Sequence, residues 1–156
     1  FQARVSRWIS RTGDGPLYLL IAVILMWNDG ARGHDFFHCV FKAFVIELPI
    51  YWLIKNSFKR ERPRNLPVFI TPSDRYSLPS GHTAASFTAV MALYLAGEKK
   101  LWKIALVLAV LIAFSRLYLY VHYPTDVLGG IITGAIAGYI GYKLTFIVQS
   151  KHRKKL

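Results

Sequence analysis

The chain has 156 residues, 54% of them hydrophobic, and its 20 Lys and Arg against 8 Asp and Glu give a formal charge of +12. The hydrophobic content excludes a disordered chain, and a single cysteine, Cys39, excludes an internal disulfide framework. A basic charge this large is typical of proteins that bind nucleic acid or an anionic membrane surface. Because the charges alternate with long apolar runs, we expect a bilayer with anionic lipids as the partner, and no nucleic acid.

The first residues predict an amphipathic helix that lies in the plane of the lipid headgroups. A helical repeat over residues 1–11 separates an apolar face from a basic face. The apolar face carries Phe1, Val5, Trp8 and Ile9, and the basic face carries Arg4, Arg7 and Arg11. The segment 12–16, with two glycines and a proline, predicts the end of this helix.

Five apolar runs follow, and each predicts a membrane-embedded helix. They cover residues 16–28, 36–54, 82–97, 101–120 and 127–149. About 20 residues, at about 1.5 Å each, cross a hydrocarbon layer of about 30 Å, so the last two runs are long enough by themselves. The first and third need flanking residues or shielding by neighbouring helices. The predicted fold is an all-α polytopic membrane bundle of about five transmembrane helices, a single domain over 1–156 that ends in a basic tail at 150–156.

Two features inside these runs bear on packing. Gly130, Gly134 and Gly138 recur at every fourth residue, which predicts a face on which a neighbouring helix approaches closely. Lys42 and Glu47 are charges within the second run, and such charges are costly in a membrane. We expect Lys42 to extend to the nearer interface and Glu47 to face the bundle interior.

Three groups of polar residues lie on one side of the predicted bundle. Five spans place the 55–81 loop and the 121–126 turn on the side of the amino terminus. The first group is basic and includes Lys55 and Arg62. Basic residues where a helix leaves a bilayer ordinarily contact anionic headgroups. We assign that role to Lys59, Arg60 and Arg64.

The second group, Ser80, Gly81 and His82, opens the third run. Ser80 predicts a helix N-cap. The free N–H groups and the positive dipole at a helix start also favour a bound anion, and Gly81 allows close approach of the backbone. A histidine here is ordinarily a satisfied interfacial residue, but His82 would also place a titratable group beside that anion.

The third group joins the last two runs and comprises Ser115, Arg116, His122 and Asp126. Arg116 is near the end of a hydrophobic span, where a charge needs an anionic partner. Because Pro124 interrupts any helix through this segment, we expect Asp126 as the N-cap of the last span, with its carboxylate turned toward His122. A carboxylate that holds one imidazole nitrogen leaves the other nitrogen free as a nucleophile.

In chain order the groups read Lys-x6-Arg-Pro, Pro-Ser-Gly-His and Ser-Arg-x5-His-x3-Asp. With this order and spacing, the sequence resembles the type 2 phosphatidic acid phosphatase superfamily, membrane lipid phosphatases that share a core with vanadium haloperoxidases. The match covers Lys55 through Asp126 directly, and each motif position is matched.

The resemblance implies a mechanism and a set of roles. His122 attacks phosphorus and becomes a phosphohistidine that Asp126 orients, while His82 protonates the leaving oxygen and later activates water. The implied ligands of the phosphate oxygens are Lys55, Arg62, Arg116, the Ser80 side chain and the Gly81 N–H. The resemblance also implies an active-site loop at 55–81, no metal and no cofactor.

Other functions stay open at this point. A vanadate-dependent haloperoxidase uses the same residues, and a non-catalytic membrane protein could bind lipid headgroups with them. The substrate also stays open among phosphatidylglycerol phosphate, phosphatidate, undecaprenyl diphosphate and lipid A phosphates. Lys and Arg are nearly balanced between the two sides, so the resemblance alone favours a bacterial inner membrane, a cytoplasmic carboxyl terminus and an active site facing the periplasm or outside.

Overall fold

The computed structural model describes residues 2–13, 15–29, 31–64, 69–72, 74–97 and 100–153. Six helices account for most of them. They are α1 (Gln2–Arg11), α2 (Gly15–Asp29), α3 (Ala31–Phe58), α4 (Gly81–Leu95), α5 (Leu101–Tyr118) and α6 (Pro124–Arg153). The predicted all-α fold is confirmed, because a helix occupies each of the five apolar runs and α1 coincides with the predicted interfacial helix.

Within the described residues, three helical segments are long and apolar enough to cross a membrane. They are Phe37–Phe58, Leu101–Tyr118 and Pro124–Phe146. Helices α2 and α4 have 15 residues each, or about 22 Å of helix at about 1.5 Å per residue, which is short of the hydrocarbon thickness. Length and composition therefore support three of the five predicted spans.

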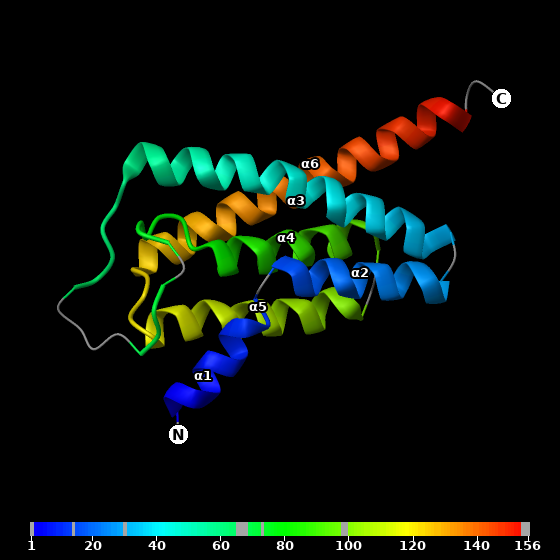
Figure 1. Ribbon diagram of the computed structural model, residues 1–156. Helices are drawn as coiled ribbons and strands as arrows, with labels where there is room; N and C mark the ends of the chain where they lie inside the picture. Colours follow the sequence, from blue (N-terminus) through cyan, green and yellow to red (C-terminus); the bar gives the residue numbers. More distant parts are fainter. Residues whose placement is uncertain are drawn as a thin grey trace.

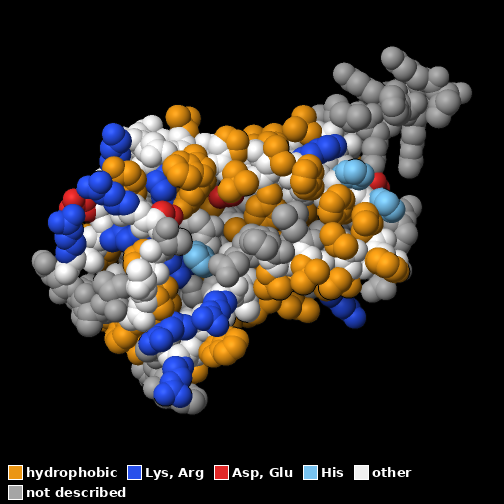
Figure 2. All heavy atoms as spheres, viewed as in Figure 1, with side chains coloured by type: hydrophobic (Ala, Val, Ile, Leu, Met, Phe, Trp, Pro, Cys, Tyr) orange, Lys and Arg blue, Asp and Glu red, His pale blue; other side chains and the backbone are white. Residues whose placement is uncertain are grey.

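The outer surface of the bundle is apolar. Hydrophobic side chains cover the middle of the molecule, while Lys and Arg gather toward one end and over α1 (Figure 2). Trp27, Leu53 and Phe114 are 86%, 70% and 66% exposed in the isolated chain. A contiguous apolar surface of this kind needs a nonaqueous environment, which a bilayer supplies.

Helices α4 and α6 pack closely through the predicted glycine face. A Cβ added at Gly130 would lie 2.6 Å from the carbonyl oxygen of Ser80, and one added at Gly134 would lie 2.2 Å from that of Ala84. One added at Gly138 would lie 2.8 Å from the carbonyl oxygen of Thr88. The prediction of a close helix contact is confirmed, and α4 is the helix that makes it.

The first boundary that differs from the prediction is the end of α3. This helix continues to Phe58, so Lys55 lies in its last turn and the connection to α4 is reduced to residues 59–80. Within that connection Ser77 donates its backbone N–H to the carbonyl oxygen of Arg60 at 2.8 Å, and Glu61 pairs with Tyr76 in an antiparallel bridge. The loop therefore folds back on itself.

The second difference is the start of α6. The helix begins at Pro124, where proline is well suited because the first helical N–H has no partner within the helix. Asp126 therefore lies in the first turn, and the prediction that it is the N-cap is wrong. At the other end α6 continues through Arg153, while 154–156 of the predicted basic tail lie outside the described residues.

The two charged residues within the second apolar run lie on α3, and the arginines of the predicted basic face lie on α1. Glu47 is buried with 4% exposure, and Lys42 is half-buried. Helix α1 packs against α5, and its Trp8 is 69% exposed, with the Arg11 guanidinium 5.4 Å from the ring centroid. Phe1 of the predicted apolar face lies outside the described residues.

Four segments meet at one end of the bundle. The end of α3, the 59–80 loop, the start of α4 and the 119–123 connection into α6 lie together on the left of Figure 1, and α6 ends on the far side of the bundle. All three predicted polar groups belong to these segments or to the last turn of α5.

Candidate active site

The structure brings the three polar groups together. Ser80 donates its backbone N–H to the carbonyl oxygen of Asp126 at 2.9 Å, which joins the second group to the third. Arg62 Nη1 donates to the carbonyl oxygen of Val121 at 2.7 Å and lies 3.3 Å from His122 Nε2, which joins the first group to the third. The residues of these groups that are buried are Lys55, Ser80, Ser115, Arg116, His122 and Asp126.

The imidazole of His122 is held in one tautomer. Its Nδ1 lies 2.8 Å from the carbonyl oxygen of Ser77, and because a carbonyl only accepts, Nδ1 carries the proton. The Nε2 atom therefore keeps its lone pair, and Arg62 lies beside it. Burial lowers the pKa of His122 to about 4, against the Asp126 carboxylate, which acts to raise it, and together with the charges of Arg116 and Arg62, which also lower it. At neutral pH this histidine has the unprotonated nitrogen that a nucleophile requires.

The carboxylate of Asp126 is turned toward the same nitrogen of His122, as predicted, but it does not accept a hydrogen bond from it. Its Oδ2 lies 3.7 Å from His122 Nδ1, which is beyond hydrogen-bond distance. Instead Oδ2 accepts the backbone N–H of Tyr123 at 2.8 Å, an arrangement that ties the first turn of α6 to the residue before it. Because a backbone carbonyl is a sufficient acceptor, Ser77 takes the position at Nδ1 that the sequence assigns to a carboxylate.

Arg60 has a more specific environment than the predicted contact with headgroups. Its Nη1 lies 3.1 Å from Asp126 Oδ1, and it also donates to the hydroxyl of Thr125. The guanidinium lies 4.3 Å from the ring centroid of Tyr123. Since the Asp126 side chain is fully buried, Arg60 is the cation that compensates it, and the assignment of Arg60 to headgroup contact is corrected.

The start of α4 leaves its first N–H groups without a side-chain cap. Ser80 is at the N-cap position with extended backbone angles, but its hydroxyl pairs with the hydroxyl of Thr83 at 2.9 Å. A Cβ at Gly81 would lie 3.1 Å from the ring of Tyr51, so the backbone is close to α3 here. His82 follows in the first turn, and its electrostatic interactions include the charges of Arg116 and Asp74. This geometry offers positive dipole and N–H groups to an anion.

Two residues that the sequence did not single out complete the site. The carboxylate of Asp74 accepts from Lys55 Nζ at 2.7 Å and from the hydroxyl of Tyr51 at 2.6 Å, and it also pairs with Arg62. Burial acts to raise the pKa of Asp74, but hydrogen bonds from Lys55, Tyr51 and Arg62 lower it to about 2. Asp74 is therefore an ionised partner of two of the predicted phosphate ligands. No spacing rule distinguishes this aspartate from other loop residues.

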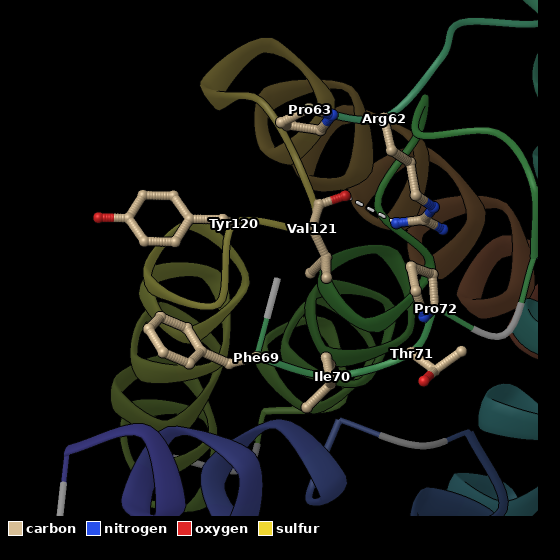
Figure 3. A pocket seen from close by; sticks show the side chains of 8 residues that line it. All are labelled: Arg62, Pro63, Phe69, Ile70, Thr71, Pro72, Tyr120 and Val121. Carbon is tan, nitrogen blue, oxygen red and sulfur yellow. Dashed lines mark hydrogen bonds between the residues drawn. The ribbon is translucent and has the colours of Figure 1, made fainter. Parts of the chain in front are cut away.

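An open pocket of about 390 Å³ lies beside Arg62. Its lining is formed by Arg62, Pro63, Phe69, Ile70, Thr71, Pro72, Tyr120 and Val121 (Figure 3). Arg62 and Thr71 supply polar groups, whereas the hydroxyl of Tyr120 points away from the other labelled side chains. The pocket can therefore enclose a mainly apolar group next to the guanidinium of Arg62.

Known proteins resemble this chain in sequence and in fold. An undecaprenyl-diphosphatase of Sulfolobus acidocaldarius is 32% identical over 107 residues, which cover 65% of this chain and 52% of that protein. The chain thus spans about half the length of this relative. The crystal structure of Aquifex aeolicus LpxE has a TM-score of 0.77 at 27% identity and covers 91% of this chain and 86% of its own. That of a transmembrane PAP2 type phosphatidylglycerolphosphate phosphatase from Bacillus subtilis has a TM-score of 0.73 at 25% identity, covering 96% and 77%.

The family comparison agrees with the three motifs and with the geometry that joins them. The model of the PAP2 superfamily matches residues 36–149, which contain most of α3, all of α4 and α5, most of α6 and every residue of the candidate site described above. The chain therefore belongs to the PAP2 superfamily.

Proposed function

We propose that this protein is a membrane phosphatase that hydrolyses a phosphomonoester or diphosphate of a lipid through a phosphohistidine intermediate. The observation that carries the proposal is the environment of His122. Its Nδ1 proton is held by Ser77, and its Nε2 lone pair lies 3.3 Å from the guanidinium of Arg62. A phosphoryl group bound to Nε2 would thus lie next to the positive charge of Arg62.

The proposed reaction has two steps. The Nε2 of His122 attacks phosphorus, forming an N–P bond as the bond to the lipid oxygen breaks, and His82 gives its proton to that oxygen. His82 then accepts a proton from water as the water oxygen attacks phosphorus, which releases inorganic phosphate and restores His122. A positioned acid and base of this kind contributes about 10²–10⁴ in rate.

The non-bridging oxygens carry the charge that develops during phosphoryl transfer. In the proposal they are held by Lys55, Arg62 and Arg116, by the hydroxyl of Ser80 and by the backbone N–H of Gly81. Fixed cations and a helix start stabilise such charge without reorganisation, because burial removes the competing water. Asp126 acts on the start of α6 and through it on the position of His122. The mechanism uses no metal ion.

The relatives and the pocket support a lipid substrate. One relative is named as an undecaprenyl-diphosphatase and one solved structure as a phosphatidylglycerolphosphate phosphatase. The mainly apolar pocket beside Arg62 suits the hydrophobic part of such a molecule. We further propose a bacterial inner membrane location, with the active site facing the periplasm or outside, the carboxyl terminus in the cytoplasm and the surplus basic residues on anionic headgroups.

Phosphate release from a panel of lipid phosphates in detergent micelles tests the function. We expect release from at least one of phosphatidylglycerol phosphate, phosphatidate, undecaprenyl diphosphate or a lipid A phosphate. His122→Ala should abolish release while the purified protein keeps its melting temperature and elution volume. Release that persists in this folded variant would contradict the phosphohistidine, and release by no lipid would contradict the function.

A further inference from the structure

We propose that Asp74 is a positioning residue that aims the guanidinium of Arg62 at the phosphoryl group on His122. The inference rests on the proposed function. Asp74 belongs to none of the three motifs, yet its side chain is bonded to two of the proposed phosphate ligands and to Tyr51. Three side chains thus converge on a carboxylate that no motif contains.

The contacts of Asp74 occupy one edge of the Arg62 guanidinium. The backbone carbonyl oxygen of Asp74 accepts from Arg62 Nε at 3.1 Å, and its carboxylate Oδ1 accepts from Nη2. These two nitrogens form one side edge of the planar guanidinium, whose N–H groups are arranged as a fork. Val121 fixes the third nitrogen, since its carbonyl oxygen accepts from Nη1 at 2.7 Å. The plane and the rotation of the guanidinium are thereby set.

One nitrogen of the guanidinium lies beside the nucleophile. Nη1 is 3.3 Å from His122 Nε2, so a phosphoryl group on that nitrogen would lie next to Nη1. Two parallel N–H groups match two phosphate oxygens, and this bidentate match depends on orientation in a way that a single charge does not. Asp74 therefore contributes geometry to the site as well as charge.

The same carboxylate is anchored to the bundle. Its Oδ2 accepts from Lys55 Nζ at 2.7 Å and from the hydroxyl of Tyr51 at 2.6 Å, both on α3. The ring of Tyr51 in turn packs against the position of Gly81. Asp74 thus transmits the position of α3 and the start of α4 to an arginine that comes from the loop.

A competing role is that Asp74 blocks the site by imitating a phosphate. The backbone contact argues against it, because a carbonyl oxygen that also binds Arg62 forms a fixed support, and Nη1 is held beside His122 Nε2. The two roles predict opposite results. Removal of the charge lowers turnover if Asp74 positions Arg62 and raises kcat/KM if Asp74 competes with substrate.

A double-mutant cycle separates position from charge. Arg62→Lys keeps the charge and removes the fork, and Asp74→Asn keeps the size of the side chain and removes its charge. We expect Asp74→Asn to lower kcat/KM about 10- to 100-fold when Arg62 is present, mostly in kcat, since misplacement by about 1 Å can cost about 10² in rate. In the Arg62→Lys background, the same change should alter kcat/KM less than about threefold, because no guanidinium is left to misplace and only the Coulombic effect, common to both backgrounds, remains.

Glu61→Gln is the matched control. Glu61 is an acidic residue of the same loop that pairs with Arg64 on the surface, where the two side chains are 61% and 72% exposed. Its loss should change kcat/KM less than twofold, because exposed pairs contribute little. If Asp74→Asn does not fold, Asp74→Glu takes its place and should show a smaller loss with the same dependence on Arg62.

Two kinetic results would overturn the inference. One is an equal effect of Asp74→Asn in the wild-type and Arg62→Lys backgrounds, and the other is a gain in kcat/KM. The same cycle run on orthovanadate affinity, measured calorimetrically without turnover, separates this failure from failure of the function. Suppose that the wild type releases no phosphate but vanadate binding shows at least tenfold coupling between positions 62 and 74. The positioning role is then supported and the proposed function is refuted. Additive effects on vanadate affinity would refute the positioning role.

Discussion

Gly134→Ala is a single added methyl group at the closest approach of α4 and α6. The new Cβ would lie 2.2 Å from the carbonyl oxygen of Ala84 and 3.0 Å from the backbone nitrogen of Thr88. Neither is the end of a flexible side chain, so the helices themselves must separate by about 1 Å to restore an ordinary contact. Overpacking of this kind costs about 1–3 kcal/mol, while replacement of a helical glycine by alanine returns about 1 kcal/mol.

The clash should be at the upper end of that range, which gives a net loss of about 2 kcal/mol and a melting temperature lower by about 4–8 °C for a chain of this size. Separation should also weaken the bond from the Ser80 N–H to the Asp126 carbonyl at the site end of the same two helices, so phosphate release should fall as well. Thermal unfolding in detergent and a phosphate assay measure the two effects. Gly129→Ala is the control, because its Cβ meets only the side chains of Leu78 and Pro79. An unchanged melting temperature in Gly134→Ala would refute the packing argument.

Four further predictions concern the site and the stability that depends on it. Arg60→Gln should lower phosphate release about tenfold, because the buried Asp126 carboxylate loses the cation that compensates its charge. The control Arg64→Gln should change phosphate release less than twofold. Equal effects of the two substitutions would support headgroup contact as the role of Arg60. Because burial lowers the pKa of His122 to about 4, the nucleophilic form of His122 should be lost only as the pH falls through about 4. A fall of kcat/KM toward acid pH that is centred near pH 6.5 would contradict this. The unfolded chain takes up that proton near pH 6.5, so the stability from neutral His122 should be complete above pH 6.5 and lost between there and about pH 4 in pH-dependent melting curves. Phosphate release should survive excess EDTA followed by gel filtration, and a loss restored by added divalent cation would contradict the metal-free mechanism.

The helices and the gathering of the three polar groups could be predicted from the sequence because both are periodic or local. Apolar runs mark the helices directly, and the four-residue spacing of Gly130, Gly134 and Gly138 marks the face that α4 packs against. A count of spans from one end also suffices to place Lys55, His82 and His122 at the same end of the bundle. These inferences need no knowledge of how the loops fold.

The parts that could not be predicted depend on the path of the 59–80 loop. Arg60 and Asp126 are 66 residues apart in the chain, and their pairing follows only once the loop has folded back. Asp74 is one of several polar residues in that loop, and its contacts with Lys55 and Arg62 have no spacing signature. Helix ends differ from the prediction for a simpler reason: α3 continues past its apolar run into polar residues, and Pro124 starts α6 where the sequence suggests only an interruption.

The main chain supplies several of the acceptors that organise this site. The carbonyl oxygen of Ser77 accepts a hydrogen bond from His122 Nδ1, and that of Asp126 accepts one from the N–H of Ser80. The carbonyl oxygens of Asp74 and Val121 accept from Nε and Nη1 of Arg62. Exchange of one side chain for another leaves each of these oxygens in the chain, so a scan of amino-acid substitutions will undercount them. Semisynthesis with an ester bond after Ser77 weakens its carbonyl oxygen as an acceptor without altering any side chain. We expect that change to weaken the preference of His122 for the tautomer with the proton on Nδ1.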